Sequence, residues 1–439
     1  MARAWPSLLL LAWHSSALVL EGPERRAHRA GGLSHASVLQ RMKYWRRATS
    51  AVPSTGKYLL FTPDAGGLNN IRIGWEMTGI VALHTGRTLV LPPKTPMYLL
   101  DWGPWNKELV GDTSNWTGST RVEDLIDVTQ LKGVLPTLTM EEFEAEAGMK
   151  WHEARVKAEK SLRWIHFKQD NVRLSDYEAL TDKFIFMDGS SRDGFRLGQW
   201  WLQGGPVDEL RPELTEADWG LLRHGFVWHP DAFNIAEKAV FYLGMFDYVA
   251  LHARFGDFAE HQSQRTPDEI YENWKPLIAN ASALYVATDR QGQFDGFAKR
   301  HGVKLVMWPD LFESATGMLL SEEKQLYTPE RFFKLTGLVE ELICTYAKVF
   351  VGTDRSSFTG HIQRMRIHAD APVTKRLTHT DGDPSLSEAG SQSAREIQVP
   401  LDEIQQSIQN WETRDWLVPP ISQGEQFRQR TVSLKRERP

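Results

Sequence analysis

The chain has 439 residues, a single cysteine, and 51 Lys and Arg against 56 Asp and Glu, for a formal net charge of −5. At 41% hydrophobic and 24% charged residues it can bury large cores, which excludes a mainly disordered or fibrous protein, and its length favours two domains. A net charge of −5 offers no basic field for nucleic acid, and Cys344 alone builds neither an intrachain disulfide nor a zinc site. We therefore expect no nucleic-acid partner, no metal and no redox chemistry.

The amino terminus has the pattern of a secretory signal. A short basic start precedes an apolar stretch, Ala4 to Leu20, which ends at a polar run. Pro6 and His14 interrupt the stretch, which favours a cleaved signal peptide over an uncleaved signal anchor or a buried helix. We expect 1–20 to be a signal peptide or signal anchor and the rest to lie in the secretory pathway, in the ER or Golgi lumen, with export from the cell left open. No other membrane segment is expected, because no later window reaches 18 apolar residues.

Residues 21–52 are polar and basic, and we assign them to a polar stem. They contain one amphipathic stretch around 38–44, which fits a docking helix as well as a stem.

A βαβ unit follows the stem. Residues 57–61 predict a strand, and apolar residues from Asn70 recur at helical spacing until Gly86, a helix-ending glycine. A second strand is predicted at 88–91. Strand, helix and strand in this order predict a parallel sheet, hence the α/β class. Residues 53–230 form the predicted N-terminal α/β domain.

The later part of that domain, from about residue 95, is irregular apart from helical stretches near 140–160. A second α/β rhythm occupies 231–370 and predicts a doubly wound domain of its own. Its expected helices are 232–241, 268–278, 292–301 and 331–347, and its expected strands are 248–252, 283–287, 303–307 and 349–351. Composition then predicts a flexible linker at 371–400 and a C-terminal helix with a basic tail at 401–439.

Ligands in open α/β sheets bind beyond the carboxyl ends of the strands, so polar residues at strand ends carry the most weight. The first such group is the turn Gly66-Gly67-Leu68-Asn69, which follows a strand and opens a helix. Glycines there let a ligand approach the backbone, and a helix N-terminus attracts an anion. The alternative is a purely structural diglycine turn.

Two further strand ends are suited to a diphosphate. After the strand 248–252, His252 and Arg254 point to the same side, and Arg254 offers a five-donor fork unless it forms an ion pair with Asp257. After the strand 349–351, Ser356 or Ser357 can cap the next helix and leave its N–H groups for phosphate. A cap without a ligand is equally compatible with this pattern.

Together these blocks resemble the GDP-fucose-dependent O-fucosyltransferases of the protein and plant type. The resemblance spans about 53–370 and is carried in order by Gly66-Gly67-Leu68-Asn69, by His252, Arg254, Asp257 and Phe258, by Ala287-Thr288-Asp289, and by Glu340, Ile343-Cys344, Gly352-Thr353 and Ser356-Ser357-Phe358. It implies two Rossmann-like domains that face a cleft, as in GT-B glycosyltransferases. The domain 53–230 would then lie on the acceptor side and contribute part of the donor site, and the domain 231–370 would bind the GDP-sugar. It also implies GDP-fucose as donor, a hydroxyl acceptor on protein Ser/Thr or a glycan, and no metal or cofactor.

The resemblance further implies a role for each matched residue. The implied substrate-binding residues are Gly66, Gly67, Leu68, Asn69, His252, Arg254, Asp257, Asp289, Glu340, Ser356, Ser357 and Phe358. Glu340 accepts from guanine N–H groups, for which a carboxylate is chemically suited. Fucosyl loss leaves negative charge on the β-phosphate, so Arg254 is the expected catalytic cation, with Asn69 positioning the diphosphate or the sugar and Asp64 as a candidate base.

The sequence departs from the family pattern at three points. Gly66 stands where some protein O-fucosyltransferases carry an acid, Glu340 replaces the more usual Asp, and Cys344 has no partner for the disulfides of animal members. Two alternatives therefore stay open. One is a transferase for another deoxysugar such as rhamnose in polysaccharide synthesis, and the other is a non-catalytic lumenal protein that binds nucleotide sugar or glycan.

Overall fold

The computed structural model describes residues 33–62, 67–97, 100–101, 118–161, 180–187, 215–255, 266–278, 281–312, 314–353, 356–369, 371 and 373–377. Two parallel sheets organise these residues, which confirms the predicted α/β class with two Rossmann-like units. The expected signal segment 1–20, nearly all of the linker 371–400 and the tail 401–439 lie outside the described residues.

The N-terminal sheet has the strand order β3-β2-β1-β4. Its strands are β1 (Tyr58–Phe61), β2 (Thr88–Val90), β3 (Thr137–Leu138) and β4 (Phe184–Met187). The helix α3 (Leu68–His84) links β1 to β2 and completes the predicted βαβ unit. Strand β4 was not predicted, and it pairs in parallel with β1 along its whole length.

The C-terminal sheet has the order β7-β6-β5-β8-β9, the arrangement of a doubly wound nucleotide-binding sheet. Its strands are β5 (Val249–Ala253), β6 (Leu284–Thr288), β7 (Leu305–Met307), β8 (Val349–Thr353) and β9 (Val373–Leu377). The strand order reverses between β5 and β8, which are neighbours in register from Val249 and Val349 onward. The carboxyl ends of β5 and β8 are therefore the place where a ligand is expected.

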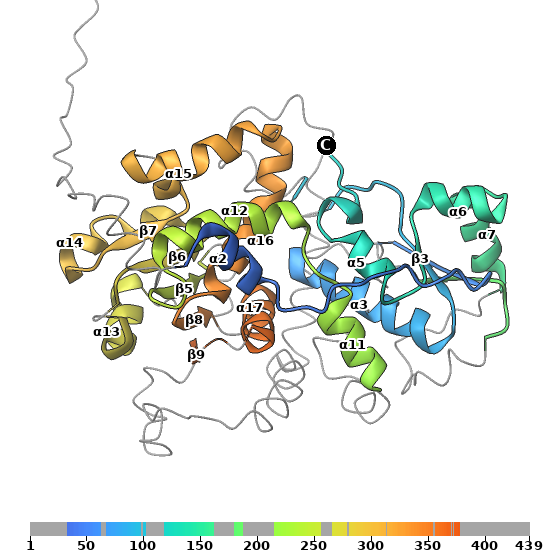
Figure 1. Ribbon diagram of the computed structural model, residues 1–439, viewed down its shortest axis with the longest axis horizontal. Helices are drawn as coiled ribbons and strands as arrows, with labels where there is room; N and C mark the ends of the chain where they lie inside the picture. Colours follow the sequence, from blue (N-terminus) through green and yellow to red (C-terminus); the bar gives the residue numbers. More distant parts are fainter. Residues whose placement is uncertain are drawn as a thin grey trace, which may run out of the picture.

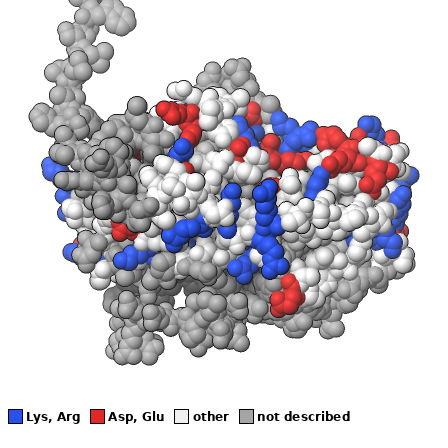
Figure 2. All heavy atoms as spheres, in the orientation of Figure 1, with Lys and Arg blue, Asp and Glu red and all other residues white. Residues whose placement is uncertain are grey.

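The remaining described helices surround the two sheets (Figure 1). They are α2 (His35–Met42), α5 (Val128–Lys132), α6 (Met140–Ala147), α7 (Trp151–Ser161), α11 (Glu216–His224), α12 (Pro230–Leu243), α13 (Pro267–Ile278), α14 (Phe297–His301), α15 (Ser314–Gln325), α16 (Pro329–Thr345) and α17 (Ser357–His368), with 3-10 turns η1 (Val122–Asp124), η3 (Gln291–Phe294) and η4 (Pro309–Leu311). On the face drawn in Figure 2, Lys and Arg side chains occur alongside Asp and Glu.

Two expectations are corrected by the helices. The helix expected at 292–301 is broken into η3 and α14, because Gly296 between them has a φ of +70°, which does not continue a helix. The segment assigned to a solvated stem contains α2, which packs against α12 with Val38 and Met42 fully buried. The docking alternative therefore holds for this part of 21–52.

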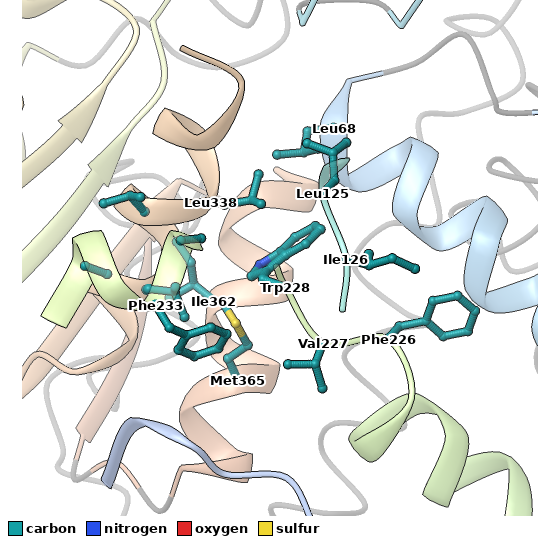
Figure 3. Close-up of a cluster of buried hydrophobic side chains, with 14 of the residues drawn as sticks. Leu68, Leu125, Ile126, Phe226, Val227, Trp228, Phe233, Leu338, Ile362 and Met365 are labelled. Atoms are coloured by element: carbon teal, nitrogen blue, oxygen red, sulfur yellow. The ribbon is translucent and has the colours of Figure 1, made fainter. Parts of the chain in front are cut away.

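The two units share one apolar core. Trp228 lies between side chains of α17, such as Ile362 and Met365, and the side of the molecule that carries Leu68 and Ile126 (Figure 3). All five of these residues are at least nine-tenths buried. Burial at about 25 cal/mol per Å² makes such a cluster a major source of cohesion between the units. The expected cleft between the two units and the domain boundaries stay predictions.

Strand β8 and helix α17 approach so closely that only glycine fits between them. A Cβ on Gly352 would lie 2.3 Å from Thr359 Cγ2 and 2.9 Å from the ring of Phe350, and Thr359 is fully buried. We predict that Gly352→Ala lowers the free energy of unfolding by about 2 kcal/mol, because overpacking forces backbone and side chains to shift. Denaturant unfolding measures this change. Gly220→Ala on α11 is the control, since its Cβ would meet nothing within 4 Å, and equal losses in both variants would contradict the packing argument.

Candidate active site

His252, near the end of β5, is a buried neutral group. Its Nδ1 lies 2.7 Å from Thr359 Oγ1, and its ring lies 4.7 Å from the ring of Phe358 on α17. Burial, assisted by the neighbouring cation of Arg254, lowers the pKa of His252 to about 3. His252 therefore carries no positive charge at neutral pH, and any contact with a diphosphate uses a hydrogen bond rather than an ion pair.

Thr353 holds the segment that carries Arg254. Its Oγ1 donates to the carbonyl of His252 at 2.9 Å and accepts from the backbone N–H of Arg254 at 3.0 Å. The hydroxyl thus ties the end of β8 to the exit of β5, and places Arg254 at the point where the strand order reverses. Thr353 is part of the sequence motif, but the sequence analysis predicted no role for it. A hydroxyl at a strand end is a usual partner for free backbone groups, and this signal could have identified it.

Asp289, at the end of β6, supports the same loop. Its Oδ1 accepts the backbone N–H of Phe255 at 2.9 Å. Asp289, which is predicted to bind substrate, thus also holds the backbone of the loop after β5. Asp64, Gly66 and Asp257 lie outside the described residues, so their assignments stay predictions.

The N-terminus of α17 holds an unused polar group. Ser356 is 2% exposed, and its Oγ has no hydrogen-bond partner among the residues that the structure describes. Its carbonyl accepts the N–H of Gly360, so the helix begins at this serine. Free N–H groups of the first turn and a buried hydroxyl together form a site suited to a phosphate oxygen. The structure places the predicted residues Ser356, Ser357 and Phe358 here.

The N-terminus of α3 lies beside that of α17. A Cβ on Gly337 of α16 would lie 3.4 Å from Leu68 Cδ2 and 3.9 Å from Phe358 Cε2, so the three helices meet at this glycine. Gly67 is the N-cap of α3 and supplies no side-chain cap. Two helix N-termini, each with a partial positive charge, thus converge from the two units.

Glu340 on α16 contacts β6 through Tyr285. Its Oε1 accepts a hydrogen bond of 3.2 Å from the hydroxyl of Tyr285. Burial raises the pKa of Glu340 to about 8, and the negative charge of Asp289 adds to that rise. A buried carboxyl group with a raised pKa is typical of a binding site whose ligand brings the hydrogen-bond donors that stabilise the ionised form.

A buried polar network connects the two units, and sequence reasoning missed it. Glu341 of α16 is fully buried and accepts from the side-chain amide of Asn69, from Trp228 Nε1 at 2.9 Å and from His361 Nδ1 at 2.7 Å. Arg72 contacts His361, and its guanidinium lies 4.5 Å from the Trp228 ring. Burial raises the pKa of Glu341, while the hydrogen bond from Asn69 and the positive charge of Arg72 oppose that rise.

The same network continues along α3. Glu76 accepts from Arg72 Nε at 2.8 Å and from both terminal nitrogens of Arg364 of α17 at 2.6 and 3.0 Å. Arg72 also donates to the carbonyl of Phe226 at 2.6 Å. The i,i+4 spacing of Arg72 and Glu76 was the one sequence signal, but the same spacing is common on solvated helix faces.

Among the described residues, no group of three His, Cys, Asp or Glu side chains is placed to hold a metal ion. No helix in the described ranges is long and apolar enough to cross a membrane. The expected absence of a cofactor and the expected signal peptide or signal anchor stay predictions.

The α/β fold and the converging helix N-termini form a site suited to the phosphates of a nucleotide. The sequence signature of the GDP-fucose protein O-fucosyltransferase family matches residues 58–368. The chain therefore belongs to this family, and it is a fucosyltransferase whose donor is GDP-fucose.

Comparison with solved structures lists fucosyltransferases at low identity. POFUT1 in complex with GDP-fucose is 17% identical, with a TM-score of 0.42, and the match covers 75% of this chain and 99% of that one. The α-1,6-fucosyltransferase NodZ soaked with GDP-fucose is 10% identical, with a TM-score of 0.40, covering 71% and 92%. NodZ from Bradyrhizobium is 11% identical, with a TM-score of 0.41, covering 71% and 92%. No curated protein sequence matches the chain.

We predict that Glu76→Ala lowers the free energy of unfolding by about 3–5 kcal/mol, because two buried guanidinium groups lose their carboxylate. Thermal and denaturant unfolding measure the loss. Glu141→Ala is the control, because its pair with Arg121 is exposed at 52% and 40% and such pairs contribute about 1 kcal/mol or less. A loss for Glu76→Ala no larger than that of the control would show that the network contributes little.

Proposed function

We propose that the chain transfers fucose from GDP-fucose to a hydroxyl of a protein or glycan acceptor, with Arg254 stabilising the leaving diphosphate. The observation that carries this proposal is the convergence of the N-termini of α3 and α17 near the switch point of the C-terminal sheet, where Thr353 holds the backbone of Arg254. Departure of the fucosyl group places negative charge on the β-phosphate. Fixed dipoles and a cation at that place lower the barrier without a metal ion.

The residues around Arg254 take complementary roles in this proposal. The N–H groups at the start of α17 and the Ser356 hydroxyl bind phosphate oxygens, neutral His252 donates or accepts a hydrogen bond, and Phe358 packs beside the base. Asp64 is the proposed base for the acceptor hydroxyl, and a dissociative path needs little help from it. The proposed location is the lumen of the ER or Golgi, reached through the segment 1–20.

We expect Arg254→Ala to lower the rate of GDP-fucose hydrolysis about 10²- to 10³-fold, as for loss of one preorganised charge donor, without loss of folding. Release of GDP by the purified protein, without acceptor, measures the rate. Arg300→Ala is the control, because Arg300 forms an exposed pair with Asp268. An unchanged rate in Arg254→Ala would refute the proposed role of Arg254, and absence of GDP-fucose binding by the wild type would favour the non-catalytic or rhamnose alternatives.

The proposed contact of Glu340 with guanine predicts that GDP binding releases a proton. Burial raises the pKa of Glu340 to about 8, so the free protein holds a proton there at pH 7. Two guanine N–H donors favour the ionised form, so binding expels up to one proton. Calorimetry of GDP binding at pH 7 in buffers of different ionisation enthalpy measures this number. Glu340→Gln abolishes the release, whereas release that persists in this variant would assign the proton to another group.

A further inference from the structure

The side-chain amide of Asn69 forms a hydrogen bond through its nitrogen but not through its oxygen. Its Nδ2 donates to Glu341 of α16, while its Oδ1 is buried and has no partner among the described residues. Asn69 is 3% exposed and lies in the first turn of α3, next to Leu68, which adjoins the start of α17. A buried acceptor without a donor is destabilising, and a bound ligand that donates a hydrogen bond to it removes this penalty.

The hydrogen-bond partners of Glu341 decide which end of the amide points away. The guanidinium of Arg72 only donates, and it lies against both ring nitrogens of His361, more closely against Nε2. Because Nδ1 also faces the Glu341 carboxylate, we assign Nε2 as the nitrogen that accepts from Arg72. The proton of the neutral ring is then on Nδ1, which donates to Glu341 Oε2. Trp228 Nε1 donates to the same oxygen, so both lone pairs of Glu341 Oε2 are used.

The positive charges of Arg72 and Arg364 and the hydrogen bonds from Asn69 and Trp228 favour the ionised form of Glu341 against the effect of its burial. Two arginines, Arg72 and Arg364, face two carboxylates, Glu76 and Glu341, in a region where all four side chains are 10% exposed or less. An ionised Glu341 accepts at Oε1 as well, and only the NH₂ group of Asn69 can donate there. The carboxylate therefore turns Oδ1 of Asn69 away from α16.

We propose that Glu341 is a positioning residue that presents the oxygen of Asn69 to the donor site, where it accepts a hydrogen bond from a hydroxyl group of the donor sugar. This inference rests on the proposed function, which places the start of α3 beside the donor. A phosphate oxygen has no proton to give to Oδ1, whereas a sugar hydroxyl has one. Asn69 thus recognises the sugar and not the diphosphate, with its orientation set by the other unit.

The test is the affinity for GDP-fucose compared with that for GDP, measured by calorimetry. In Glu341→Gln, Trp228 and His361 still require an acceptor oxygen, so the new NH₂ group faces Asn69 and reverses its amide. We expect the affinity for GDP-fucose to fall about tenfold, the equivalent of about 1.4 kcal/mol, and the affinity for GDP to stay the same. Glu237→Gln, a buried carboxyl on α12 paired with His35, is the control and leaves both affinities unchanged.

A second substitution provides the rescue. Adding Asn69→Asp to Glu341→Gln gives one carboxylate oxygen that accepts the new NH₂ group and a second that faces the sugar, so the affinity for GDP-fucose returns. Asn69→Asp alone sets two carboxylates against each other and weakens GDP-fucose binding. If Glu341→Gln does not fold, Asn69→Leu serves instead and is expected to lose the same tenfold for GDP-fucose only.

The outcomes separate this inference from the proposed function. Failure of the wild type to bind GDP or GDP-fucose refutes the proposed function itself. Equal weakening of GDP and GDP-fucose in Glu341→Gln shows that Asn69 acts on the GDP part of the donor and not on the fucose, and overturns the inference. No change in either affinity, or a loss that Asn69→Asp does not rescue, overturns it as well, because Oδ1 then has no sugar partner.

Discussion

The buried network around Glu76 and Glu341 is the constraint on which the rest of the structure depends. It takes side chains from α3, α16 and α17, and these helices belong to different sheets. Burying four charged groups is costly, and the cost is recovered only when every partner is in place. An apolar contact tolerates sliding, whereas a bidentate pair such as Arg364 with Glu76 does not. The network thereby fixes the register of α3 against α17.

That register determines the electrostatics of the candidate site. It brings two helix N-termini together at Gly337, within the family span that also contains Arg254 and the neutral His252. The site thus combines one side-chain cation with oriented N–H groups, which suits an anion that gains charge during the reaction. Glu340 supplies the opposite chemistry toward β6. One end of the site favours phosphate and the other favours a ligand with paired N–H donors.

The sequence predicted the parts of this arrangement that are local. Short apolar strands followed by polar turns identified β1, β5 and β8, and with them the positions of Asn69, His252 and Ser356. Strand β4 was not predicted, because its four residues lie in an irregular region and its pairing with β1 is a long-range contact. The buried network around Glu76 and Glu341 was not predicted either, because its contacts are also long-range. Nothing in the sequence near Glu341 indicates that its partners come from α3.

Buried arginines explain how a chain with one cysteine cross-links distant segments. Arg366 of α17 donates to the carbonyls of Thr345 and Ala347 at 2.8 and 2.7 Å, and so closes the end of α16 that holds the buried Cys344. Arg87 donates to the carbonyl of Leu180 at 2.8 Å, before β4, and Arg72 reaches Phe226.

Each of these arginines is 2% exposed or less. A guanidinium has five donors in a fixed plane, so one side chain can satisfy several carbonyls that a loop would otherwise bury without a partner. Such a cross-link depends on geometry instead of redox state. Arg72 serves both purposes at once, because the carbonyl that it binds and the histidine that it contacts also determine how Glu341 holds Asn69. Cohesion between the units and orientation of the proposed sugar contact therefore share the same side chain.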